Sequence, residues 1–131
     1  MTRKAIWILA CCASLLAFSA SGCGRFKKPS TVVHSLYMDC NNGEYPKARA
    51  LFVASKREDF DGALNANAPE IRGVCDRLTH SQTLTSVQIT GEVIQGEKAT
   101  VFADAHFSDG SAKLGAQTKL VVEEGAWKVI E

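Results

Sequence analysis

The stretch that decides the fold is Gly96–Glu131, GEKATVFADAHFSDGSAKLGAQTKLVVEEGAWKVIE. Apolar and polar side chains alternate along it with a period of two, as in a strand that buries one face. Two apolar sets have this spacing: Ala99, Val101, Ala103, Ala105 and Phe107, and then Leu114, Ala116, Thr118, Leu120 and Val122. Ser108-Asp109-Gly110 and Glu124-Gly125 are turn sequences that separate the runs. We therefore predict three successive antiparallel strands in this stretch.

The pattern extends upstream as one more strand and then changes. The run 84–93 keeps the period of two, and Gln95-Gly96-Glu97 forms the turn that follows it. Upstream of His80 the apolar spacing becomes helical. This order predicts an α+β domain in which N-terminal helices pack on one face of a curved, four-stranded antiparallel meander.

We predict three helices before the sheet. Ser30 or Thr31 is expected to cap the first helix, and Asn67 the third, with Pro69 near its first turn. The polar segment 56–67 between the second and third helices is expected to be irregular. The expected helical bounds are about 30–40, 45–54 and 67–78.

The composition describes one small domain. The chain has 131 residues, 46% of them hydrophobic, and a formal net charge of +1 at pH 7. This length suffices for a single domain. A near-neutral charge provides no basic surface for a polyanion, so we do not expect a nucleic-acid partner.

The N-terminus has the layout of a bacterial lipoprotein signal. Thr2-Arg3-Lys4 is a short basic region, and Ala5–Phe18 is a run of 14 residues without a charge. A membrane-spanning helix needs about 20 apolar residues, so this run better suits a signal peptide. Ala20-Ser21-Gly22-Cys23 resembles a lipobox, although Ala20 stands where Leu is usual. The alternatives are an ordinary signal cleaved after Gly22 and an uncleaved anchor.

This layout predicts the organisation and the location of the protein. We expect residues 1–22 to be a signal peptide, 23–30 a lipidated tether and 31–131 the globular domain. An acylated Cys23 would hold the protein at a bacterial membrane, facing the periplasm. In lipoproteins the residue after the cysteine influences sorting. Gly24 is not the Asp that is typical of inner-membrane retention, so we favour the outer membrane.

Cys40 and Cys75 are the cysteines that remain in the domain. Each lies on the apolar stripe of its own predicted helix, and an exported chain enters an oxidising compartment. We expect the two to form a disulfide, with two separate buried thiols as the alternative. Neither has a CxxC or CxxH neighbour, so we expect no metal site at these positions.

Three segments of the domain carry a family resemblance. They are Asn42–Leu51, with its Gly-acid-Tyr and helix-spaced Ala, the strand opening Gly-acid-x-Ala-x-Val at Gly96, and the closing Gly-x-Trp-Lys-Val at Gly125. Their order resembles small bacterial lipoproteins of unknown function in the nuclear-transport-factor-2-like (NTF2-like, or cystatin-like) superfamily. The resemblance implies a curved sheet wrapped around a helix, which forms a cone with a pocket. That superfamily includes enzymes, ligand binders and interaction modules, so the fold does not settle the function.

Enzymes of that superfamily place Asp, His and Tyr inside the cone, so we sought such a set. His34 and Tyr37 are three residues apart on the first predicted helix, and Asp104 and His106 share one strand face. If the opposite, apolar face packs on the helices, the Asp–His pair points to solvent. Phe102, on the same face as this pair, lines the second side of the sheet or belongs to an exposed apolar patch. The sequence has no metal-ligand spacing of histidines, Ser-His-Asp signature or phosphate loop.

We therefore expect a lipid-anchored, non-catalytic domain of the cell envelope. Its partner would be an envelope protein or a small apolar ligand, and we expect no cofactor. The oligomeric state stays open, with a homodimer through the sheet as one alternative. The alternative function is a pocket enzyme of ketosteroid-isomerase or dehydratase style, in which an Asp–His pair moves a proton.

Overall fold

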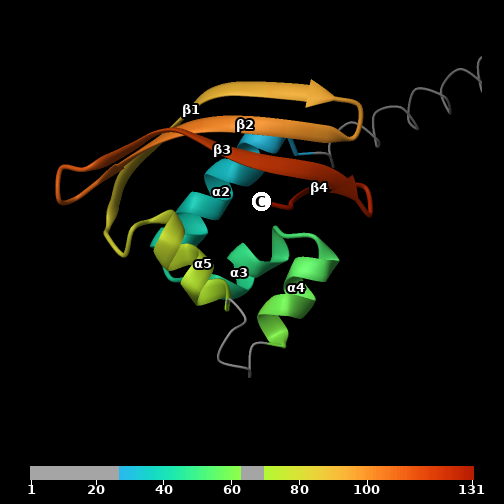
Figure 1. Ribbon diagram of the computed structural model, residues 1–131, viewed down its shortest axis with the longest axis horizontal. Coiled ribbons are helices and arrows are strands. Elements are labelled where there is room, and N and C mark those ends of the chain that lie inside the picture. Colours follow the sequence, from blue (N-terminus) through green and yellow to red (C-terminus); the bar gives the residue numbers. More distant parts are fainter. Residues whose placement is uncertain (1–26, 63–69) are drawn as a thin grey trace, which may run out of the picture.

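The computed structural model describes residues 27–62 and 70–131, and this part of the chain holds four helices and four strands (Figure 1). The predicted signal peptide, residues 1–22, and the predicted lipid site, Cys23, lie outside the described residues. None of the helices in residues 27–62 and 70–131 has both the length and the apolar character required to cross a membrane.

Helix α2, Pro29–Asn41, lies against the sheet and supplies the centre of the core (Figure 1). Its buried side chains recur every three or four residues along one face: Val32, Val33, Leu36, Tyr37 and Cys40. The predicted cap at residue 30 or 31 is wrong, because the helix begins at Pro29 with Lys28 as its N-cap. Proline suits the first helical position, where its missing N–H would have had no helical partner.

The predicted second helix, 45–54, ends earlier than expected: α3 covers Tyr45–Ala50, and a further helix, α4, covers Ala54–Asp61. The backbone between them pairs with the C-terminal end of the domain. The Val53 N–H donates to the Val129 carbonyl at 3.1 Å, and the Val129 N–H donates to the Leu51 carbonyl at 2.8 Å. This pairing separates α3 from α4.

Helix α4 also corrects the expectation that 56–67 is irregular, since the first six residues of that segment are helical. The helix is polar except for Ala54 and Phe60, and Phe60 is 7% exposed. The Phe60 ring packs edge-on against the Phe52 ring, with centroids 5.1 Å apart. This aromatic contact attaches α4 to the core, and a hydrogen bond from the Ala54 N–H to the Glu123 carboxylate, 2.8 Å long, holds its first residue.

Helix α5, Ile71–Leu78, ends at the predicted residue and begins after Glu70, its N-cap. The predicted cap Asn67 and the nearby Pro69 lie outside the described residues. A disulfide joins Cys75 of α5 to Cys40 of α2, with 5.0 Å between their Cα atoms. The expected pairing of these two cysteines is thus present, and it links α5 to the helix that lies under the sheet.

The four strands form the predicted antiparallel meander. Their bounds are β1 Leu84–Gln95, β2 Lys98–Phe107, β3 Ala112–Glu123 and β4 Ala126–Val129, in the spatial order β1-β2-β3-β4. Alternate residues of β2 are buried against the helices: Ala99, Val101, Ala103, Ala105 and Phe107. Small alanines on this inner face let α2 approach the sheet closely, and the fold is α+β with the helices on one face.

A bulge in β3 changes which residues reach that inner face. Ala116 pairs with Ala103, but Lys113 pairs with Ala105, so β3 has one residue more than β2 in this interval. The Gly115 backbone has a positive φ of 64°, and Leu114 is 69% exposed. The prediction that Leu114 shares the buried face of β3 is therefore wrong, because the extra residue shifts the alternation.

Candidate functional site

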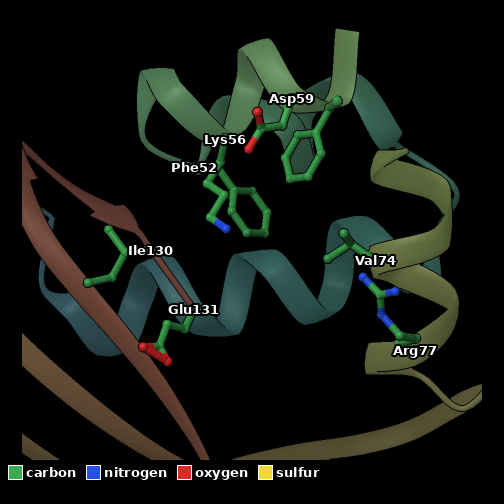
Figure 2. Close-up of a pocket in the computed structure, with 8 residues that line it drawn as sticks. Phe52, Lys56, Asp59, Val74, Arg77, Ile130 and Glu131 are labelled. Atoms are coloured by element: carbon green, nitrogen blue, oxygen red, sulfur yellow. The ribbon is translucent and has the colours of Figure 1, made fainter. Parts of the chain in front are cut away.

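A cavity opens between α4, α5 and the C-terminal residues of the chain. Its volume is about 230 Å³. Figure 2 shows Phe52 toward its centre, with Val74 and Arg77 projecting from α5 and Ile130 and Glu131 on the opposite side. The full lining is Phe52, Lys56, Asp59, Phe60, Val74, Arg77, Ile130 and Glu131.

A second cavity, of about 200 Å³, lies where α2 and α5 face β3. It shares Phe52, Val74 and Glu131 with the first, so the two adjoin. Its other lining residues come from α2, α5, β3 and β4: Leu36, Tyr37, Leu78, Lys113, Ala116, Gln117, Thr118 and Val129. We call the two together the open-end cavity.

The position of α5 explains why this space is not filled. Its main contacts within the described chain are with α2 and α3, and the disulfide to Cys40 holds it there. It is therefore fixed to the helical layer rather than to β3. Val74 and Leu78 of α5 face this space rather than pack fully, and both are partly buried.

Tyr37 is the one predicted pocket residue that lines the open-end cavity. Its side chain is fully buried, and its hydroxyl has no hydrogen-bond partner among the described residues. Burial raises the pKa of Tyr37 above its ordinary value, so the hydroxyl is protonated at neutral pH. A buried, unpaired hydroxyl is costly, and a ligand or water oxygen would relieve that cost.

The other predicted pocket residues lie elsewhere. His34 is exposed on α2, beside an open hollow that Ser30, Thr31 and Ile89 also line. Asp104 accepts a hydrogen bond from the Gly115 N–H at 2.8 Å and so supports the β3 bulge. These residues therefore do not form a common site with Tyr37.

His106 and Phe102 occupy the face of the sheet that points away from the helices. His106 is exposed, and Phe102 is half-buried. A Cβ added to Gly91, on the neighbouring strand, would come within 3.3 Å of the Phe102 ring, so this glycine makes room for the ring. Phe102 thus lines the second side of the sheet, which is one of the two expectations for it.

The sequence did not indicate most of the cavity. Phe52 and Val74 have helical spacing that is typical of ordinary core residues, and nothing local shows that α5 stands away from β3. Lys113 was hidden by the bulge, although the Gly in Leu114-Gly115-Ala116 is a known signal of such an irregularity in a strand. Among the described residues, no group of three or more His, Cys, Asp or Glu is arranged to hold a metal ion.

Comparisons with known proteins add a fold likeness. No protein-family model matches this chain, and no curated protein sequence does. A crystal structure from Campylobacter jejuni, named an NTF2-like transpeptidase, is 13% identical with a TM-score of 0.61, and the match covers 79% of this chain and 97% of that one. The solution structure of a SEC-C motif containing protein from Rhodopseudomonas palustris is 18% identical with a TM-score of 0.60, covering 93% of this chain and 87% of that one. Together with the observed α+β architecture, these structures support an NTF2-like fold for this chain, and at such identities the likeness concerns the fold alone.

Proposed function

We propose that this protein is a lipid-anchored domain of the bacterial cell envelope that binds a small apolar ligand in the open-end cavity without catalysing a reaction. The observation that carries the binding part is the wall of the cavity. Aromatic and aliphatic side chains from three helices and two strands line it, together with five charged side chains. Cavities of this composition are the usual sites for small apolar molecules.

The placement of the titratable residues favours binding over catalysis. An acid–base enzyme needs its proton-transferring group within hydrogen-bond reach of the substrate. His34, Asp104 and His106, the sequence-predicted candidates for this role, all lie outside the open-end cavity. The enzyme alternative would have to depend on other titratable residues of the cavity wall, namely Tyr37, Lys56, Asp59, Lys113 or Glu131.

Blocking the cavity tests the binding proposal. Val74 lines both halves of the cavity and is partly buried, so Val74→Phe should fill the junction between them. The uncharged fluorophore N-phenyl-1-naphthylamine is the probe, and its fluorescence rises when it enters an apolar site. We expect Val74→Phe to weaken its binding at least about tenfold, which corresponds to about 1.4 kcal/mol.

Val93→Phe is the matched control, because Val93 is 50% exposed near the end of β1 and does not line the cavity. It adds the same volume to the protein and should leave binding unchanged. Circular dichroism spectra of both variants establish that they are folded. Absence of binding by the unmodified protein, or equal binding by Val74→Phe, would contradict the proposal.

The anchor part of the proposal depends on the sequence of the N-terminus. A basic region, an uncharged run of signal-peptide length and small residues before Cys23 agree with a lipoprotein signal, residues 1–22 being removed and 23–30 forming the tether. Each buried methylene of an acyl chain adds about 0.8 kcal/mol of membrane affinity, so several chains on one cysteine anchor stably. Gly24 favours the outer membrane as the destination.

Cell fractionation tests the anchor separately from the cavity. We expect Cys23→Ser to move the protein from the membrane fraction to the soluble periplasmic fraction or to leave it unprocessed at a higher mass. The matched control is Cys12→Ser, in the uncharged run, which should not alter fractionation. Retention of mature Cys23→Ser protein on membranes would contradict lipidation at this residue.

A further inference from the structure

The β3 bulge brings a lysine to the inner face of the sheet. Cross-strand partners in an antiparallel pair lie on the same face, and Lys113 is the partner of Ala105, which is fully buried against the helices. Without the extra residue at Leu114-Gly115, Leu114 would take that inner position. Bulges of this kind commonly redirect a side chain next to a functional site.

Lys113 is a cation on a largely apolar wall. Its side chain is half-buried and lines the half of the open-end cavity between α2, α5 and β3, where most lining residues are apolar. Among the described residues it has no ion pair and no hydrogen bond from its side chain. The Lys113 ammonium is therefore available to pair with an anionic group of a ligand in the cavity.

The charges around the cavity agree with a single bound anion. Lys56 and Arg77 line the outer half, and neither forms an ion pair within the described chain. Glu131 lines both halves, but its carboxylate is already 3.4 Å from the Lys119 ammonium. Asp59 is the other carboxylate of the wall. Three cations and two carboxylates, one of them already paired with Lys119, leave an excess of positive charge around the cavity, which favours an anionic ligand.

We propose that the ligand of the open-end cavity is an apolar molecule with one carboxylate, whose negative charge Lys113 binds while the Tyr37 hydroxyl donates a hydrogen bond to it. The inference rests on the proposed function and names the chemical class of its ligand. Both residues line the same half of the cavity, and neither has another partner among the described residues. Leu36, Phe52 and Val74 would contact the apolar part of the ligand.

Octanoate and octan-1-ol are the probes that test this assignment, because they have the same chain length and differ in charge. Binding to the purified full chain is followed by chemical-shift changes in titrations of the isotope-labelled protein. We expect octanoate to bind at least about tenfold more tightly than octan-1-ol. Lys113→Gln should weaken octanoate binding enough to remove most of that difference in affinity, and Lys113→Arg should keep the difference.

Lys98→Gln is the matched control, because it removes the same charge from an exposed position outside the cavity. It should bind octanoate like the unmodified protein. Tyr37→Phe should weaken octanoate binding several-fold, and unchanged affinity in that variant would overturn the role of the hydroxyl. Thermal unfolding of each variant shows whether the fold is retained.

The outcomes separate this inference from the binding proposal on which it rests. Equal affinity of the unmodified protein for octanoate and octan-1-ol, or full octanoate affinity in Lys113→Gln, overturns the carboxylate assignment and leaves an apolar binding cavity. Binding of neither probe, together with no binding of the naphthylamine, overturns both.

Discussion

The two ends of the domain are built in different ways. We call the part of the domain where α2 packs directly on the sheet the closed end. Its side chains Val33, Val101 and Leu120 are at most 1% exposed. At the open end, α5 is held to α2 by a disulfide and faces β3 across the open-end cavity. The comparison indicates that packing specifies the closed end, whereas a covalent link and a bulge shape the open end and leave room for a ligand.

Removing the disulfide should have the largest effect on stability. Its cysteines are 35 residues apart, and in the chain-entropy model a loop of this size adds about 3–4 kcal/mol to the free energy of unfolding. We expect urea denaturation to show that the Cys40→Ala, Cys75→Ala double variant has a free energy of unfolding lower by that amount. Amide hydrogen exchange should accelerate most in α5, and uniform acceleration across the sheet would contradict the comparison.

A large loss is also expected when a side chain is shortened at the closed end. Leu120 is 1% exposed in the core between α2 and the sheet. Leu120→Ala leaves a cavity there and should lower the free energy of unfolding by about 3 kcal/mol. Chemical denaturation measures this change, and octan-1-ol affinity measured on the folded variant should remain close to that of the unmodified protein.

The bulge should show an intermediate effect. Gly115 has a φ of 64°, and no atom lies within 4 Å of an added Cβ, so Gly115→Ala meets only the unfavourable left-handed conformation. We expect thermal unfolding to show a free energy of unfolding lower by about 1 kcal/mol. Octanoate should also bind more weakly, because Lys113 would be misplaced.

Gly73→Ala is the control for that substitution. Gly73 lies within α5, has no neighbour within 4 Å of an added Cβ and has no positive φ. Alanine is the better helix former, so this variant should be more stable by up to about 1 kcal/mol. If Gly→Ala lowers the free energy of unfolding at position 115 and raises it at position 73, the backbone conformation, not the side-chain volume, sets the effect at the bulge.

The smallest effect is expected at Leu114, one residue before the bulge glycine. Because Leu114 is 69% exposed, Leu114→Ala should change the free energy of unfolding by no more than about 0.5 kcal/mol. It is the same substitution on the same strand as Leu120→Ala. A loss near that of Leu120→Ala would mean that Leu114 is in the core after all and that Lys113 is not.

The alternation of β2 and the turns at 108–110 and 124–125 allowed the meander to be predicted, since a period of two is a local property of the chain. The disulfide was predictable because both cysteines lie on apolar helical stripes. The early end of the second helix at Ala50 was not predictable, because it depends on backbone pairing of Leu51 and Val53 with the distant Val129.

The candidate site was far less predictable than the fold. Tyr37 was identified from its position on the first helix, but Lys113 reaches the cavity only through a bulge that reverses the alternation around it. Asp104, a candidate acid by its sequence position, instead accepts the Gly115 N–H of that same bulge. The register between β2 and β3 therefore determines which residues reach the site. The periodicity of a single strand does not reveal that register.

The hydrogen bond between the Ser30 N–H and the Glu92 carboxylate bears on how the domain would stand on a membrane. It fixes the start of α2 beside the end of β1, whereas the Asn41 side chain accepts from the Leu84 N–H at the other end of both elements. The 13 residues of α2 span about 20 Å between these points. The described chain therefore begins at one pole of the domain, while the disulfide and Lys113 lie toward the other. If the proposed anchor holds the domain by the pole at which α2 begins, Lys113 would lie on the side away from the bilayer.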